Sequence, residues 1–237
     1  MIRTVFWYVM GWTYLVITLP VLLRVKYLDQ CGEIEKRDQL VNDFSMQIAR
    51  FFVKISGSTV IVRGEENLPP DGPVLFVSNH QGHMDSPIIH GYIKIPKGFV
   101  SIVEVKKFPI LRTWMRYMKC IFLDRSDPKQ SLECINEAVQ FLKHGHSMVI
   151  FPEGKLSDGG EISEFRNGSL RLAIKSGVPI IPITIKGSYK IMNKSGSKIQ
   201  PATIECIISK PINTTAIDRN GEKELLKLVR ETIIEKL

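Results

Sequence analysis

From about residue 58 onward, short apolar runs alternate with segments of helical periodicity. The apolar runs predict strands at 60–63, 74–78, 99–103, 121–123, 148–151, 180–185 and 204–208. Apolar residues at helical spacing predict helices at 110–118, 128–143, 169–175 and 222–236. This alternation is typical of an α/β fold in which helices flank a mostly parallel sheet.

The first 57 residues follow a different pattern. Residues 4–23 carry no formal charge, and twenty helical residues measure about 30 Å, the thickness of the hydrocarbon layer. A second helix is expected over 33–56, where apolar residues recur at mostly helical spacing. We therefore predict two domains: a membrane-associated helical hairpin at 1–57 and the α/β domain at 58–237.

The apolar run allows several interpretations. No small-residue cleavage site follows it, which disfavours a signal peptide. A single transmembrane helix is possible, but Trp7, Tyr8, Trp12 and Tyr14 lie inside the run rather than at both of its ends, and Pro20 interrupts it. We favour a helix that lies in one leaflet. The remaining alternative is that both helices simply pack on the domain core.

Composition narrows the possible partners. A chain of 237 residues with 44% hydrophobic and 24% charged residues is a folded domain rather than a disordered chain. Its net charge of +8 favours an anionic membrane surface, phosphorylated substrates or nucleic acid. No nucleic-acid-binding motif is present, so we expect no nucleic acid partner. The four cysteines form no CxxC pair, and we expect reduced thiols and no metal site.

The first candidate for chemistry follows the strand at 74–78. Asn79 and His80 come directly after it, and Asp85 follows His80 by five residues. If a helix begins there, the Asp85 carboxylate can hold one imidazole nitrogen and leave the other as a general base for an alcohol. His83 is a rival base, but residues two apart do not share a helix face. The alternative is a helix-capping aspartate beside a structural histidine.

Other apolar runs also end in polar residues. Phe-Pro-Glu-Gly at 151–154 brings Glu153 to the same sheet edge, where it can hydrogen-bond a substrate hydroxyl or brace a cation; an ordinary turn is the alternative. Arg125 follows the strand at 121–123 and offers a guanidinium fork suited to phosphate, or a surface ion pair. The two prolines of 177–183 predict a strand near a sheet edge or the wall of an apolar tunnel.

Together, the segments NHQGHMD, IFLDR, FPEG and VPIIP resemble, in order and spacing, the motifs of the glycerolipid acyltransferase family, as in bacterial 1-acyl-glycerol-3-phosphate acyltransferases. The resemblance covers about 60–186. It implies that His80, supported by Asp85, deprotonates the sn-2 hydroxyl of lysophosphatidic acid. The oxygen then attacks the thioester of acyl-carrier protein or acyl-CoA and yields phosphatidic acid, with no cofactor, metal or covalent intermediate. It also implies a location at the cytoplasmic face of the cell membrane.

The same resemblance implies a set of substrate-binding residues, and this chain departs from the family pattern at two points. The implied residues are Asn79, Lys107, Arg125, Glu153, Gly154 and Lys155. The family continues FPEG with Thr-Arg-Ser, where the arginine helps to hold a substrate phosphate; here Lys155-Leu156-Ser157 follows. The family lysine before a Glu-Leu step is also missing at Val103, although Lys107 matches a later lysine.

These departures leave alternatives open. The acceptor can be another lysolipid or glycerol-3-phosphate. A non-catalytic module that binds lipid or carrier protein at a membrane surface is the alternative from a different class.

Overall fold

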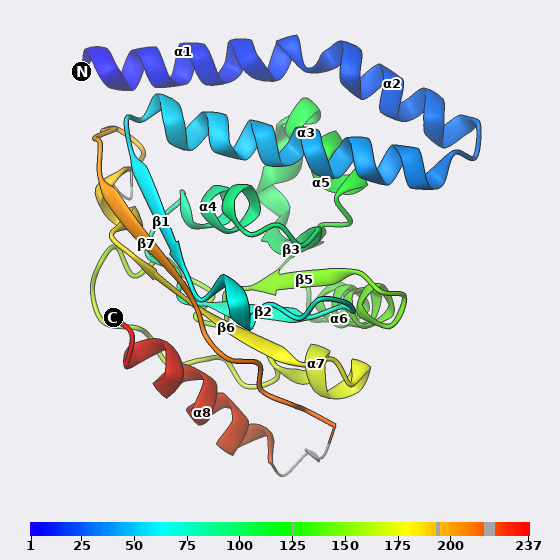
Figure 1. Ribbon diagram of the computed structural model, residues 1–237, viewed down its shortest axis with the longest axis vertical. Helices are drawn as coiled ribbons and strands as arrows, with labels where there is room; N and C mark the ends of the chain where they lie inside the picture. The colour runs from blue at the N-terminus through cyan, green and yellow to red at the C-terminus, as the bar shows by residue number, and fades with distance from the viewer. Residues whose placement is uncertain (125, 193–194, 216–220) are drawn as a thin grey trace.

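A single mixed sheet organises the chain, and helices cover both of its faces (Figure 1). The computed structural model describes residues 1–124, 126–192, 195–215 and 221–237. The strands are β1 (Thr59–Arg63), β2 (Leu75–Ser78), β3 (Lys97–Ile102), β4 (Ile121–Leu123), β5 (Ser147–Ile150), β6 (Ile180–Lys186) and β7 (Thr203–Ile208). The helices are α1 (Ile2–Ile17), α2 (Leu19–Gln30), α3 (Ile34–Ile55), α4 (Asp85–Tyr92), α5 (Pro109–Tyr117), α6 (Pro128–Lys143), α7 (Arg171–Ser176) and α8 (Glu222–Ile234).

The strand order is β1-β7-β6-β2-β5-β3-β4. Every pair is parallel except β6 with β7. Strands β2 and β5 are buried along their whole length, as expected where helices cover both faces of a parallel sheet. The predicted fold class, an α/β domain with a mostly parallel sheet and flanking helices, is confirmed.

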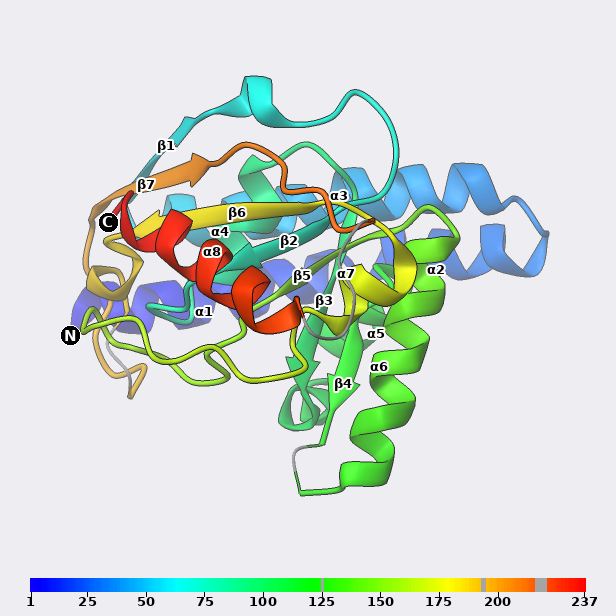
Figure 2. The same ribbon diagram turned by 90° about the horizontal axis from the view of Figure 1, so that it is seen from below.

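The side chains of each strand alternate between two apolar layers. On β2, Leu75 and Val77 face the layer built by α6, α7 and α8, while Phe76 faces the layer that contains α4 and the end of α3. Figure 2, seen from below, shows α8 lying across the strands and α6 alongside β4. The two layers bury the sheet and leave its carboxyl-terminal edge as the place where polar loops gather.

Strand β6 lies between β7 and β2, so the expected position of its prolines near a sheet edge is wrong. Pro182 has no N–H to donate, but antiparallel pairing with β7 begins only at Ile183, which faces Ile208. The carbonyl of Pro182 accepts the N–H of Ser209 just beyond the end of β7. The proline therefore occupies a register position just beyond the end of the neighbouring strand β7, where no ladder hydrogen bond is lost.

The N-terminal helices form a bent pair that lies along α3 (Figure 1). The bend falls at Thr18, two residues before Pro20, and Thr18 Oγ1 accepts a hydrogen bond of 3.0 Å from the Trp114 indole of α5. Near the start of α1, the Trp7 indole donates to the Phe52 carbonyl of α3 at 2.9 Å. These contacts hold one side of the pair against the domain.

The other side of the α1–α2 pair is exposed and apolar. Its exposed large apolar residues are Ile2, Val5, Phe6, Tyr8, Val9, Trp12, Val16, Ile17, Leu19, Leu23 and Tyr27. Ile2–Gln30 is one helical stretch long and apolar enough to cross a membrane, and only 28% of its most apolar window is buried inside the protein. A surface of this kind is rare on a monomeric soluble domain.

We expect Gly98→Ala to destabilise the fold by about 1–3 kcal/mol. A Cβ at Gly98 would lie 2.4 Å from the backbone carbonyl oxygen of Lys119, which cannot move without shifting the β3–β4 connection. Denaturant unfolding in detergent measures the change. Gly160→Ala is the matched control, because its Cβ would come no closer than 3.2 Å to its nearest neighbour, and we expect a much smaller effect. Equal effects at the two sites would contradict the steric argument.

The burial of Lys97 leads us to expect that the free energy of unfolding depends on pH in the neutral to alkaline range. Its side chain is 4% exposed, and its ammonium group donates to the Ile93 carbonyl at 2.6 Å. Burial lowers the pKa of Lys97 to about 7. Between pH 7 and the ordinary lysine pKa near 10.5, the unfolded chain therefore binds the proton that the folded chain lacks.

We expect this group to raise the free energy of unfolding by about 1.4 kcal/mol per pH unit as the pH rises through that window. Lys97→Met removes the group, so the variant is more stable than the parent at pH 7, and the advantage shrinks at pH 9. Unfolding curves of both proteins at the two pH values test this. A difference between them that does not change with pH would contradict it.

Candidate active site

The candidate site lies at the carboxyl ends of β6, β2 and β5, which are neighbours in the sheet. Strand β2 ends at Ser78 and delivers Asn79 and His80 to this edge. A tight loop then leads into α4, which begins at Asp85. The turn after β5 carries Phe151 and Glu153, and the turn after β6 carries Ser188.

The Asp85 carboxylate reaches the His80 imidazole, as the five-residue spacing and the start of a helix allow. His80 Nδ1 and Asp85 Oδ2 are 2.7 Å apart, and Asp85 is fully buried. Oδ2 also accepts the Gly82 N–H at 2.9 Å, and Oδ1 accepts the Ser188 hydroxyl. A buried carboxylate with this many donors acts as an acceptor, so the Nδ1 position carries the imidazole proton and Nε2 keeps its lone pair.

The imidazole of His80 is positioned from a second side by Phe151. The two rings stack with centroids 4.0 Å apart and an angle of 17° between their planes. The His80 side chain remains 22% exposed and lines a cavity of about 490 Å³. His80 Nε2 makes no hydrogen bond to any described residue, so it is available to a substrate hydroxyl.

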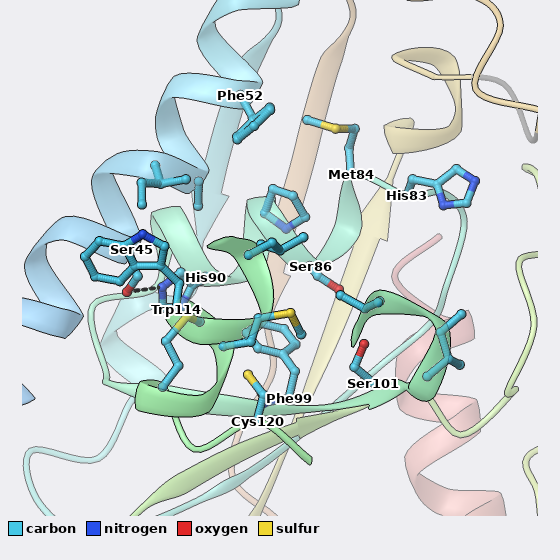
Figure 3. Close-up of a pocket in the computed structure, with 18 of the residues that line it drawn as sticks. Ser45, Phe52, His83, Met84, Ser86, His90, Phe99, Ser101, Trp114 and Cys120 are labelled. Atoms are coloured by element: carbon cyan, nitrogen blue, oxygen red, sulfur yellow. Dashed lines mark hydrogen bonds between the residues drawn. The ribbon is translucent and has the colours of Figure 1, made fainter. Parts of the chain in front are cut away.

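The cavity extends from His80 between α3, α4, α5 and β3, and its walls are mostly apolar (Figure 3). Phe52, Met84, Phe99, Trp114 and Cys120 are among its lining residues. Its size and lining suit an extended apolar chain.

The same wall includes a buried histidine, His90 on α4. His90 Nε2 lies 2.8 Å from Ser45 Oγ. Burial lowers the pKa of His90 well below the usual histidine value, so this wall of the cavity stays uncharged at neutral pH.

Glu153 braces the site through the backbone. Its Oε1 accepts the N–H of His80 at 2.7 Å, and its Oε2 accepts the N–H of Ser163 at 2.9 Å. Burial raises the pKa of the Glu153 carboxyl above its usual value, and the two N–H donors oppose that rise. Both oxygens are therefore engaged by the chain itself, and the expected contact with substrate stays a prediction.

Asn79 is also engaged by the chain. The side chain is fully buried, its amide donates to the Ile185 carbonyl at 2.9 Å, and its carbonyl accepts the Ile185 N–H at 2.8 Å. This pair of bonds ties the end of β2 to β6. The position of Asn79 beside His80 thus has a structural reason that its motif alone does not reveal.

Of the remaining predicted substrate-binding residues, Gly154 and Lys155 follow strand β5, and Lys107 follows strand β3. Gly154 lines the cavity with a φ of +66°, in the left-handed region that favours glycine, and Lys155 and Lys107 are exposed. Arg125 lies outside the described residues. The sequence argument missed Ser188, although a polar residue after the apolar run at 180–185 was a usable signal. It also missed Arg166, which follows the FPEG turn in a polar loop and is brought back to that turn only by the fold.

The chain is similar in sequence to a family of acyltransferases. Residues 59–186 match the family model described as Acyltransferase. A chloroplastic 1-acyl-sn-glycerol-3-phosphate acyltransferase of Arabidopsis thaliana is 36% identical over 66% of this chain and 44% of its own. An enzyme of the same name from Borreliella burgdorferi is 25% identical over 81% of this chain and 79% of its own. The chain spans 44% and 51% of the Arabidopsis relative and of a Brassica napus relative, about half their length.

The crystal structure of the 1-acyl-sn-glycerophosphate acyltransferase PlsC from Thermotoga maritima is similar over nearly the whole chain. Its TM-score is 0.88 at 28% identity, covering 99% of this chain and 93% of that one. The similarity therefore includes the bent N-terminal helices as well as the sheet. With the family model matching more than half of its residues, including His80, Asp85 and the FPEG turn, the chain belongs to the Acyltransferase family.

Proposed function

We propose that this protein transfers a fatty acyl group from a thioester to the sn-2 hydroxyl of 1-acyl-glycerol-3-phosphate, lysophosphatidic acid, and so forms phosphatidic acid. The observation that carries the proposal is the His80–Asp85 pair, whose free nitrogen opens onto an apolar cavity of about 490 Å³. The names of the relatives support this acceptor.

The mechanism follows from the tautomer that Asp85 imposes. His80 Nε2 removes the proton of the acceptor hydroxyl as its oxygen attacks the thioester carbonyl, and Asp85 stabilises the imidazolium that forms. The tetrahedral oxyanion collapses, the carbon–sulfur bond breaks, and the imidazolium returns the proton to the thiolate. The new oxygen ester and the free thiol leave. No acyl-enzyme forms, so the three buried cysteines are not needed as nucleophiles.

The donor in this proposal is acyl-carrier protein or acyl-CoA. Its acyl chain occupies the apolar cavity, with the thioester at the His80 end. Both donors are anionic, and the net charge of +8 favours their approach.

We assign residues 1–57 to membrane association and residues 58–237 to catalysis. The exposed apolar side of α1 and α2 lies in one leaflet at the cytoplasmic face, where lysolipid is found. Arg24, over the Tyr27 ring, and Lys26 stand at the edge of this side and favour an anionic lipid surface. Helix α1 also lines the cavity through Trp7 and Leu15, so in this proposal the acyl site adjoins the membrane.

A second acceptor is favoured by one observation, the Lys155-Leu156 departure from the family pattern. A lysine is a point charge rather than a planar fork, so the phosphate geometry that it accepts is less restricted. Under this alternative, the same chemistry acts on another lysolipid or on glycerol-3-phosphate. Initial rates across acceptors at a fixed donor concentration discriminate between the two. A non-catalytic lipid-binding module predicts no product with any acceptor.

His80→Ala tests the reaction class. We expect transfer to fall by about 10²- to 10⁴-fold, because the general base is lost, while folding and vesicle binding are unchanged. The assay follows labelled phosphatidic acid made from lysophosphatidic acid and palmitoyl-CoA or palmitoyl-carrier protein. His144→Ala, at the end of α6, is the control histidine and should retain activity. Near-normal turnover by His80→Ala would overturn the assignment.

Phe6→Glu tests the membrane surface. Phe6 is 51% exposed on α1, so a charge there leaves the core intact but places a carboxylate in the hydrocarbon region. We expect the fraction of protein that sediments with phosphatidylglycerol-containing vesicles to fall several-fold. Leu228→Glu is the matched control, since Leu228 is 50% exposed on α8, on the opposite side of the sheet from α1. If both variants bind vesicles like the parent, the α1 surface is not the membrane contact.

A further inference from the structure

A second groove, of about 300 Å³, lies on the α6–α7 side of the sheet and adjoins the catalytic cavity. The two spaces share Val100, Ser101, Phe151 and Gly154 as lining residues. Ser101 is labelled where β3 ends in Figure 3, and Phe151 is the ring stacked on His80. A substrate whose reacting atom lies at His80 can therefore extend past Gly154 into this groove.

The groove is cationic. Arg166, Arg171 and Lys175 line it, and no aspartate or glutamate is found among its described lining residues. Arg171 is already neutralised, because its Nε lies 3.1 Å from an oxygen of Glu222. Arg166 forms no salt bridge with any carboxylate in the described part of the chain, and its side chain is exposed. The groove thus presents an uncompensated guanidinium.

The position of Arg166 is nevertheless defined by the FPEG turn. Its backbone N–H donates to the Pro152 carbonyl at 3.0 Å. Its guanidinium lies so close to Gly154 that a Cβ there would be 2.6 Å from Nε and 2.8 Å from Cζ. The glycine at 154 therefore serves two purposes: it permits the φ of +66° and it leaves room for the arginine.

We propose that Arg166 and the groove around it bind a phosphate ester of a substrate whose reacting group lies at His80. A planar guanidinium suits phosphate, which accepts two parallel N–H bonds. The inference rests on the proposed function, because that reaction has two substrates that carry a phosphate ester. They are the acceptor lysolipid and the thioester donor, whose phosphate belongs to its phosphopantetheine. Arg166 also supplies the guanidinium that Leu156 does not.

Arg166→Ala tests the site by separating the two substrates. We expect the KM for one of them to rise about tenfold or more, with a smaller change in kcat, because a charge-assisted hydrogen bond is lost. Arg166→Lys keeps the charge without the fork and should recover part of the loss. Lys223→Ala removes one exposed positive charge on α8 and is the matched control for net charge. Thermal unfolding of each variant verifies that the fold is intact.

Substrates that lack a phosphate show whether Arg166 binds the phosphate of the donor or that of the acceptor. If Arg166 holds the donor, Arg166→Ala and the parent turn over an acyl-N-acetylcysteamine thioester equally well, and the KM for palmitoyl-CoA rises. If it holds the acceptor, the two proteins acylate monoacylglycerol equally well, and the KM for lysophosphatidic acid rises. Unchanged KM values for both phosphorylated substrates, with Arg166→Ala behaving like Lys223→Ala, would overturn the proposal.

A binding measurement keeps this inference separate from the proposed reaction. In a His80→Ala background, palmitoyl-CoA and lysophosphatidic acid vesicles are titrated with and without Arg166→Ala. A loss of about tenfold in affinity for either ligand supports the groove even if the parent protein transfers no acyl group. Equal affinities for both ligands reject the groove even if transfer is observed.

Discussion

The buried carboxylate of Asp85 is the interaction on which the site depends. It accepts bonds from His80 and Gly82 on the loop after β2 and from Ser188 after β6. A fully buried carboxylate is costly unless each of its oxygens is satisfied, so the loops that supply these donors are held in one arrangement. The same carboxylate selects the imidazole tautomer. Structural and chemical requirements therefore meet in a single side chain.

Glu153, in the turn after the neighbouring strand β5, is a second buried carboxylate that accepts hydrogen bonds from the surrounding loops. Its two oxygens join the loop of His80 to the loop that contains Ser163, and the FPEG turn is thereby fixed against both. Phe151 then stacks on His80, and Gly154 leaves room for Arg166. Two buried carboxylates, each bonded to backbone N–H groups, thus organise the loops that position His80. Such preorganisation avoids reordering the loops during the reaction.

The N-terminal helices connect this site to its proposed surroundings. One side of α1, α2 and α3 packs around Trp114, and α1 and α3 also line the cavity beside His80. The other side of α1 and α2 is exposed and apolar. The groove that contains Arg166 lies on the opposite face of the sheet. Under the two proposals, apolar chains would lie on the membrane side and anionic groups on the aqueous side, with His80 between them.

The sequence by itself determined the α/β class, nearly all the strands and helices, and the His80–Asp85 pair. These follow from local periodicity and from a spacing short enough for one turn to close. Lys97 and Gly98 were not predicted as strand, because neither residue favours one; pairing with Ser147 and Met148 decides it. Only the tertiary structure decided the central position of β6 and the hydrogen bonds of Glu153 and Asn79. It also decided the close contact of the Arg166 guanidinium with Gly154. Each joins residues that are not neighbours in the sequence, and the local pattern of apolar and polar positions does not encode such contacts.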